Sequence, residues 1–173
     1  MRRETAIPLT GLFLFMILWG CGYGLEGRAT PLTREIQTIA VPTVGNETME
    51  AGIEDVFTRA LIREFNLDGR ILVVPEKRAD GILRGSIQDF SIASLSYDAT
   101  GLVLEYRATV ILGLTLQRVD TGQVIWSEPS MQEVEEYRVV SDALTNEARK
   151  REAVEEIARE LAETVHDLIL GGF

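Results

Sequence analysis

The sequence predicts an α+β fold in which two α-helices pack on one face of a mostly antiparallel β-sheet of about four strands. The order of its segments is strand, helix, several strands, helix, and this order is typical of that class. Two segments repeat apolar residues with the helical period, and one long segment alternates strictly between apolar and polar residues. Because 46% of the 173 residues are hydrophobic, we expect one packed domain.

The first strand and the first helix are predicted between residues 35 and 69. Residues 35–41 alternate and are rich in β-branched side chains, and Pro42 ends this strand. An amphipathic helix is expected from Met49 onward, with Thr48 as its N-cap and Gly69 as its stop. Its apolar stripe has the spacing of one helix face and comprises Ile53, Val56, Phe57, Ala60, Leu61 and Phe65.

Four further strands are indicated between the two helices. Residues 70–74 form a short one and residues 81–92 a longer one. Residues 104–117 place apolar side chains on one face and polar ones on the other, which is typical of an antiparallel sheet with one covered face. A tight turn at residues 120–123 predicts a hairpin to the strand 124–136. The apolar face comprises Leu104, Tyr106, Ala108, Val110, Leu112, Leu114 and Leu116.

The last segment predicts a long amphipathic helix. Ser141 or Asp142 can cap its start, and the glycines at 171–172 stop it. One stripe carries its apolar side chains: Val154, Ile157, Ala158, Leu161, Val165, Leu168 and Ile169.

The N-terminus has the layout of a secretory signal peptide over residues 1–20. Two arginines precede the apolar run 9–20, whose 12 residues are shorter than the roughly 20 that a membrane-spanning helix needs. The residues that follow resemble the lipobox of bacterial lipoproteins, since Leu18, Gly20 and Cys21 match it while Trp19 departs from it. The resemblance implies that Cys21 becomes the N-acylated, S-diacylglyceryl end of the mature chain, with residues 21–34 as a tether before a single domain at 35–173.

Several classes of protein are excluded or disfavoured by the composition. The glycines 22, 24 and 27 spell G-x-G-x-x-G, but neither a strand before them nor a helix after them supports a nucleotide site. The net charge of -10 disfavours nucleic acid as a partner. One cysteine and one histidine cannot form a zinc site, a disulfide or an iron–sulfur cluster, so no cofactor or metal is expected.

An enzyme is also disfavoured. A periplasmic hydrolase would need a nucleophile, a base and an orienting group, and His166 alone is interpreted as a structural histidine near the end of the last helix. Glu133, Glu135 and Glu136 are interpreted as a solvated charge cluster rather than as the paired carboxylates of a glycosidase.

The mature chain as a whole resembles the LPS-assembly lipoprotein family LptE. The residues that carry this resemblance are "CGYGL", "IAVPTVGNET" followed by "IEDVFTRALIREF", "LRGSI", "LEYRATVILGLTL", "TGQVIW" and "SDALTNEARKREAVEEIARELAE". The resemblance implies a lipid-anchored domain on the periplasmic side of the outer membrane. It would plug the β-barrel LptD and help to deliver lipopolysaccharide to the cell surface, and Gly22 after the cysteine agrees with outer-membrane sorting.

A ligand site can be proposed from that role. Lipopolysaccharide carries phosphates, which arginine binds with charge-assisted hydrogen bonds. Arg84 and Arg107 fall on strands expected to be neighbours and are the candidate contacts, while cross-strand ion pairing with Asp or Glu is the alternative. An auxiliary lipoprotein of another, ABC-type lipid transport system remains the alternative function.

Overall fold

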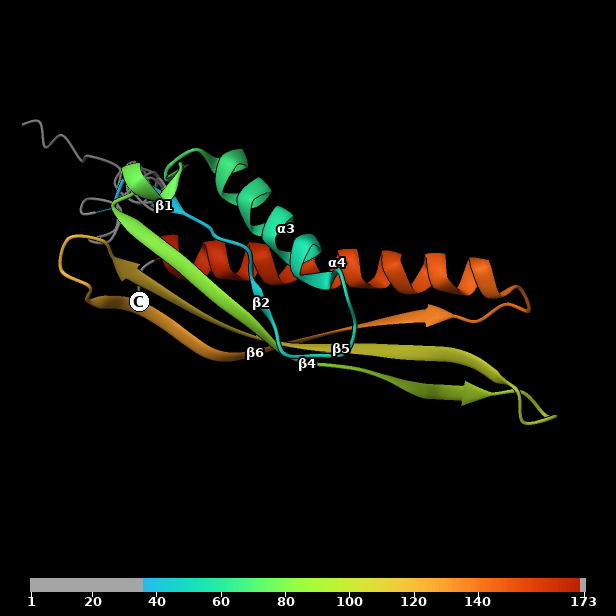
Figure 1. Cartoon of the computed structure of the whole chain (residues 1–173). Helices are drawn as coiled ribbons and strands as arrows, with labels where there is room; N and C mark the ends of the chain where they lie inside the picture. The colour runs from blue at the N-terminus through green and yellow to red at the C-terminus, as the bar shows by residue number, and fades with distance from the viewer. Residues whose placement is uncertain (1–35, 172–173) are drawn as a thin grey trace, which may run out of the picture.

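A long sheet with two helices on one of its faces makes up residues 36–171, the part of the chain described by the computed structural model (Figure 1). The predicted α+β class is confirmed. The predicted signal peptide, Cys21 and the tether lie outside the described residues. In chain order the elements are β1 (Thr38–Ala40), β2 (Gly45–Asn46), α3 (Ile53–Asp68), β3 (Leu72–Val73), the 3-10 helix η2 (Glu76–Arg78), β4 (Gly81–Tyr97), β5 (Val103–Arg118), β6 (Val124–Arg138) and α4 (Ala143–Gly171).

The sheet is larger and more mixed than predicted. Five of its six strands follow the order β3-β1-β4-β5-β6, and β2 pairs with β4 further along the same edge as β1. The long strands β4, β5 and β6 are antiparallel, but β1 is parallel to β3 and β4, and β2 is parallel to β4. Helix α3 separates β1 and β2 from β3 and β4 in the sequence, and such a crossover gives parallel pairing between strands on either side of it. The expectation of about four mostly antiparallel strands was therefore wrong.

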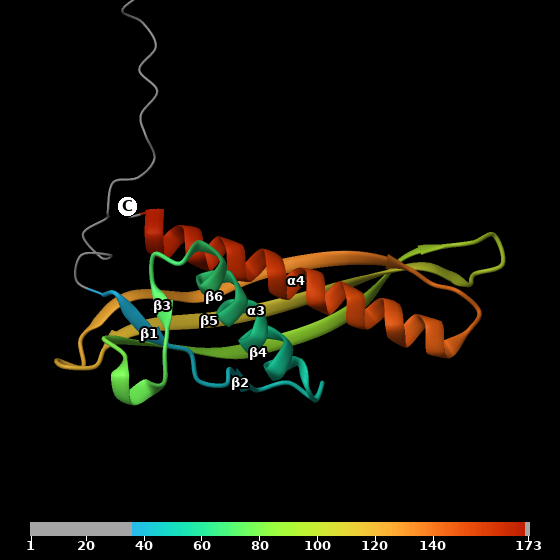
Figure 2. The same ribbon diagram turned by 90° about the horizontal axis from the view of Figure 1, so that it is seen from above.

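Both helices lie over the same face of the sheet (Figures 1 and 2). Helix α3 starts later than predicted, because Thr48 bonds the side chain of Asn46 at the end of β2, and Gly52, with a φ of 90°, takes the N-cap position. Gly69 ends α3 as predicted, with a φ of 70° and its N–H donating to the Phe65 carbonyl. Asp142 caps α4 as predicted, accepting the N–H of Thr145 at 2.8 Å.

The hydrophobic core lies between the sheet and the helices. On β5 every second side chain from Ala108 to Leu116 is buried, as the alternation predicted. Leu104 continues the same face but is 46% exposed, because the β4–β5 hairpin extends beyond the helices (Figure 1). The helices contribute Phe57, Leu61 and Phe65 from α3 and Ile157, Leu161 and Val165 from α4.

The long strands make the molecule elongated. They contain 17, 16 and 15 residues, and at about 3.3 Å per residue each spans roughly 50 Å. None of the helices between residues 36 and 171 combines the length and the apolar character needed to cross a membrane.

Candidate functional site

The face of the sheet that the helices leave uncovered, here called the open face, presents polar side chains. Directly paired residues of neighbouring strands lie on the same face. On β5 the open face carries Glu105, Arg107, Thr109, Thr115 and Gln117, all exposed or half-buried. The predicted polar face of this strand is therefore free of helices, and it offers hydrogen-bonding groups to a partner or ligand.

Arg84 and Arg107 both lie on this open face, on neighbouring strands as predicted. Arg84 pairs in register with Thr115, which is eight residues along β5 from Arg107. At about 3.3 Å per residue the two arginines are roughly 26 Å apart, so the structure does not bring them into one site.

Each of the two arginines is engaged in an exposed ion pair. Arg84 Nη2 lies 3.0 Å from Glu76 Oε1, and Arg107 Nη2 lies 2.7 Å from Glu136 Oε1 on β6. The second contact is the cross-strand pairing that the sequence left open as the alternative. Exposed pairs of this kind contribute about 0–1 kcal/mol, so either arginine can exchange its carboxylate for another anion at little cost.

The middle of the open face is bridged by a hydrogen bond across β5. Gln88 sits in a bulge of β4, and its Nε2 donates to the carbonyl oxygen of Pro129 in β6 at 2.9 Å. A second irregularity of pairing lies between Leu112 and Leu114, where β6 carries Pro129. The bridge passes over Gly113, which has no side chain to block it. Bulges bend a strand and increase its twist, so both irregularities act on the sheet at the same point.

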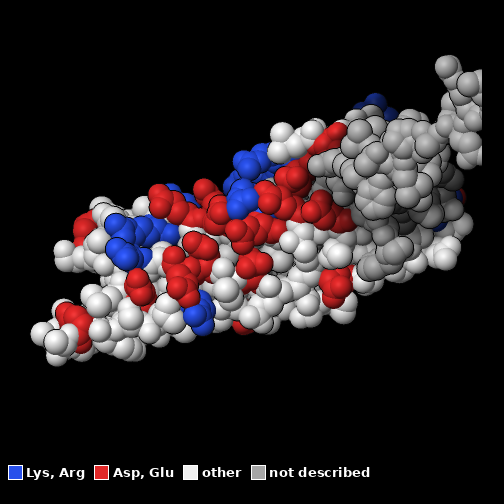
Figure 3. All heavy atoms as spheres, turned by 180° about the vertical axis from the view of Figure 1, so that it is seen from behind, with Lys and Arg blue, Asp and Glu red and all other residues white. Residues whose placement is uncertain are grey.

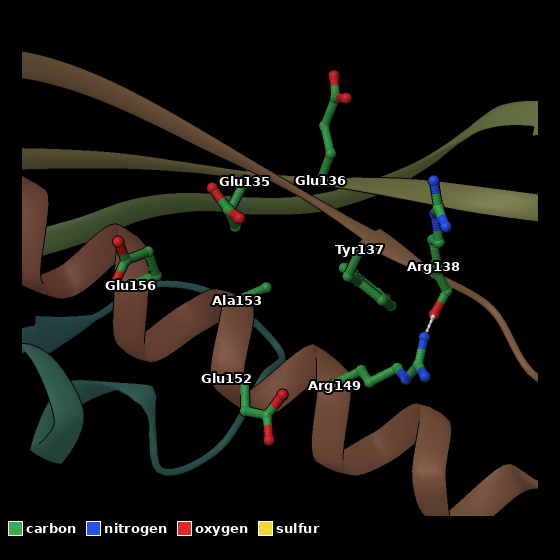
Figure 4. A pocket seen from close by; sticks show the side chains of 8 residues that line it. All are labelled: Glu135, Glu136, Tyr137, Arg138, Arg149, Glu152, Ala153 and Glu156. Carbon is green, nitrogen blue, oxygen red and sulfur yellow. Dashed lines mark hydrogen bonds between the residues drawn. The ribbon is translucent and has the colours of Figure 1, made fainter.

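A groove of about 500 Å³ lies on the other side of the sheet, between β6 and α4 (Figure 4). In this view Glu135 on β6 and Glu156 on α4 point toward one another, while Glu136 points away to the open face. Arg149 closes one end by donating to the carbonyl oxygen of Arg138 at 2.9 Å. The lining residues are Glu135, Glu136, Tyr137, Arg138, Arg149, Glu152, Ala153 and Glu156.

The side of the molecule formed by β6 and α4 is strongly acidic. Figure 3 shows acidic side chains in a band along this side. Partial burial, together with the charges of Glu160 and Glu156, raises the pKa of Glu135. The three glutamates predicted as a solvated cluster are thus split, because Glu136 pairs with Arg107 whereas Glu135 faces the helix.

His166 is buried and joins the two helices. Its Nε2 lies 2.8 Å from Asp68 Oδ2 at the end of α3, and its ring meets that of Phe65 edge to face at 5.5 Å. This packing agrees with the structural role predicted for the histidine. Within residues 36–171, no three side chains of Asp, Glu, His or Cys come together closely enough to hold a metal ion.

Two polar contacts between segments that are distant in the sequence were not predicted. Lys150 on α4 lies 3.0 Å from Glu50 in the loop before α3, and its pKa is raised because hydrogen bonds to Glu147 and Glu50 outweigh its partial burial. Asp80 accepts hydrogen bonds from the hydroxyl and the amide of Thr38 on β1. Neither contact has a local sequence signal, since 100 and 42 residues separate the partners.

Solved structures with the same fold include several lipoproteins. An uncharacterized lipoprotein B from Nitrosomonas europaea is 13% identical, with a TM-score of 0.58 over 87% of this chain and 92% of that one. A putative lipoprotein from Caulobacter crescentus is 13% identical, with a TM-score of 0.56 over 75% and 88%. A minor lipoprotein from Acinetobacter baumannii is 11% identical, with a TM-score of 0.54 over 78% and 91%. At these identities the likeness shows a shared fold.

The family is shown by the sequence itself. The chain has no match among the sequences of curated proteins. The pattern of the LptE family, described as lipopolysaccharide-assembly, matches residues 36–169, which are nearly all the described residues. The chain therefore belongs to the LptE lipopolysaccharide-assembly family.

Proposed function

We propose that this protein is an outer-membrane lipoprotein that acts as the plug and assembly subunit of the lipopolysaccharide translocon, as the partner of the β-barrel LptD. The match of the LptE family over residues 36–169 is the observation that carries this proposal. The subunit is proposed to be non-enzymatic and to help lipopolysaccharide reach the cell surface.

The membrane anchor in this proposal is Cys21. Its lipobox, Leu18 to Cys21, follows a signal-peptide pattern in the sequence. Acyl chains add about 0.8 kcal/mol of membrane affinity per buried CH₂, so several chains on one cysteine would hold the domain on the membrane almost permanently. Outer-membrane location, on the periplasmic side, is part of the same proposal.

The open face of the sheet suits a position inside a barrel. Barrel lumens are polar and wet, so a plug should present hydrophilic surface that needs no apolar cover. Thr109, Thr115 and Gln117 supply such a surface along β5. The proposal therefore places this face, rather than the acidic groove beside α4, toward the lumen and its lipopolysaccharide.

Arg84 and Arg107 are proposed as two separate phosphate contacts on that face. Each would release its exposed carboxylate partner, Glu76 or Glu136, when a phosphate approaches. We expect Arg107→Glu to weaken binding of purified lipopolysaccharide several-fold, whereas Arg149→Glu, with the same change of charge on the helix side, should leave binding unchanged. Equal effects of both substitutions would remove Arg107 from the site and point to net charge alone.

The partnership with the barrel is tested by crosslinking in cells. A photoreactive residue replaces Thr109 on the open face of the full-length chain, and the adducts are purified in mild detergent. The proposal expects an adduct with a large β-barrel protein, which disappears when Cys21→Ser is added because the chain is no longer delivered to the membrane. Adducts with the subunits of an ABC transporter, in place of a barrel, would favour an auxiliary role in another lipid transport system.

A further inference from the structure

Within residues 36–171, the long strands of the sheet leave two free edges that differ in character. On one side no described strand lies beyond β6, and on the other side β4 is covered by β1 and β2 only as far as Ile87. Figure 2 shows β2 beside the middle of β4 and no strand of the described chain beside the far half of β4. Free edges expose unpaired backbone N–H and C=O groups, which can pair with another chain.

The edge of β6 is protected in the ways that natural sheets use. Pro129 interrupts it, and the pairing with β5 is irregular at the same place. Glu133, Glu135 and Glu136 then put three carboxylates into four consecutive positions. Proline, bulges and charges all oppose the addition of a further strand, so this edge is blocked.

Over Asp89–Ser94 the edge of β4 carries no proline and only one charge, that of Asp89. These six residues pair without interruption with Ile111–Tyr106 of β5, between bulges at Gln88 and Leu95. After Asp89 the segment reads FSIAS, with neither a proline nor a charge. We call this stretch the bare edge.

The two faces of the bare edge differ in chemistry. Phe90 and Ile92 pair with Val110 and Ala108, which are buried, so both lie on the helix side. Phe90 packs partly against the core, while Ile92 is 39% exposed. Asp89 is exposed and lies on the open face. A strand placed here would meet an apolar border on one face and a carboxylate on the other.

We propose that the bare edge binds a short extended segment of another protein, which adds a strand to the sheet beside Asp89–Ser94. Main-chain hydrogen bonds to β4 would supply the pairing, and alternate apolar side chains would pack beside Phe90 and Ile92. A basic residue on the opposite face of the segment would pair with Asp89, in keeping with the net charge of -10 of this chain. This inference does not depend on the proposed function.

The length and place of the added strand follow from β2. The N–H of Glu47 donates to the carbonyl oxygen of Ile87 at 2.9 Å, so the edge position beside Ile87 is occupied. A partner must end or turn away at Gln88. About six residues therefore fit, which is a common strand length in proteins.

A second copy of this chain fits the bare edge poorly. If two copies paired antiparallel over Asp89–Ser94, Ile87 of one copy would face Ser96 of the other. That side of Ile87 is already taken by β2, so β2 of each copy would meet the hairpin of its partner. Antiparallel pairing of two copies over all of Asp89–Ser94 is thus blocked. A segment with no neighbouring strand of its own is therefore the favoured partner.

A synthetic peptide of six residues, acetyl-Lys-Val-Thr-Val-Thr-Val-amide, tests the proposal with the full chain in detergent micelles. We expect it to slow hydrogen exchange at least tenfold at the amides of Asp89–Ser94 that point away from β5. The same peptide methylated at its alternate backbone nitrogens should give no protection, since it cannot donate the pairing hydrogen bonds.

Two matched substitutions separate the bare edge from the rest of the sheet. Ile92→Lys places a charge against the apolar face of the peptide and should weaken binding at least tenfold. Val134→Lys on β6, at a site of similar exposure (37% against 39%), should leave binding unchanged. The proposal would be overturned if the peptide gave no protection, or if the methylated peptide protected equally well. It would also be overturned if the two substitutions had equal effects, or if dimers protected Asp89–Ser94 without peptide.

Discussion

Replacing Gly113 by Ala is expected to destabilise the fold by about 0.5–4 kcal/mol. A Cβ atom at this position would lie 2.8 Å from the backbone carbonyl oxygen of Pro129 and 2.5 Å from Gln88 Nε2. The backbone of Gly113 is not in the left-handed region, so crowding rather than φ is the cause. The change therefore acts on the bridge that crosses the open face from β4 to β6.

The magnitude follows from three contributions. Overpacking against the fixed carbonyl costs about 1–3 kcal/mol. Displacement of the Gln88 side chain removes a hydrogen bond worth about 0.5–1.5 kcal/mol. Alanine in a strand is better than glycine by about 0.5–1 kcal/mol, which offsets part of the loss. The sum is about 0.5–4 kcal/mol and is destabilising throughout this range.

Urea unfolding of the purified protein, followed by circular dichroism, measures this effect. Gln88→Ala alone should cost only the hydrogen bond, about 0.5–1.5 kcal/mol. In the Gln88→Ala background, Gly113→Ala should cost less than in the native chain but should still destabilise, because the Pro129 carbonyl stays in place. A Gly113→Ala protein as stable as the native one would refute the close approach of the three strands.

Three further outcomes are expected. Ile157→Ala, at a fully buried position of α4, should lower the free energy of unfolding by about 2–5 kcal/mol in urea, while Glu155→Ala on the exposed side of the helix should change it little. The pKa of Asp80 is lowered, chiefly by the hydroxyl of Thr38. The ionised carboxylate therefore stabilises the fold above about pH 4, and this stabilisation is lost as the pH falls below that value. The difference in urea midpoint between the native chain and Asp80→Asn should accordingly be larger at pH 6 than at pH 3. Cys21→Ser should move the protein from the membrane fraction to the soluble fraction, and an unchanged distribution would contradict the lipid anchor.

The long antiparallel strands and both helices could be predicted because their patterns are local. Strict alternation along β5 marks its buried face, and Gly69 and Asp142 mark helix ends through their own backbone and side-chain chemistry. Strand β2 could not be found in this way. Gly45–Asn46 is too short to show a period, and its pairing with Ser86 and Ile87 depends on the position of α3.

The candidate site was also predictable only where the sequence pattern is local. The alternation placed Arg84 and Arg107 correctly on neighbouring strands, but their register depends on the bulges of β4 and the turn after Tyr97, so the distance between them was not predictable. The sequence predicted that Arg107 could pair with an Asp or Glu, but it did not identify which one. Glu135 and Glu136 are adjacent in the sequence, yet they occupy opposite faces of β6. Facing side chains are thus set by strand pairing, which the sequence pattern alone does not determine.

The central claim is that this LptE-family protein helps lipopolysaccharide reach the cell surface, and a depletion experiment tests it most directly. Expression of the protein is shut off in its native host, and newly made lipopolysaccharide is quantified at the cell surface and in the periplasmic and inner-membrane fractions. The account predicts a fall at the surface with accumulation inside, restored by the native chain but not by Cys21→Ser. Unchanged delivery of lipopolysaccharide to the surface after depletion would contradict it.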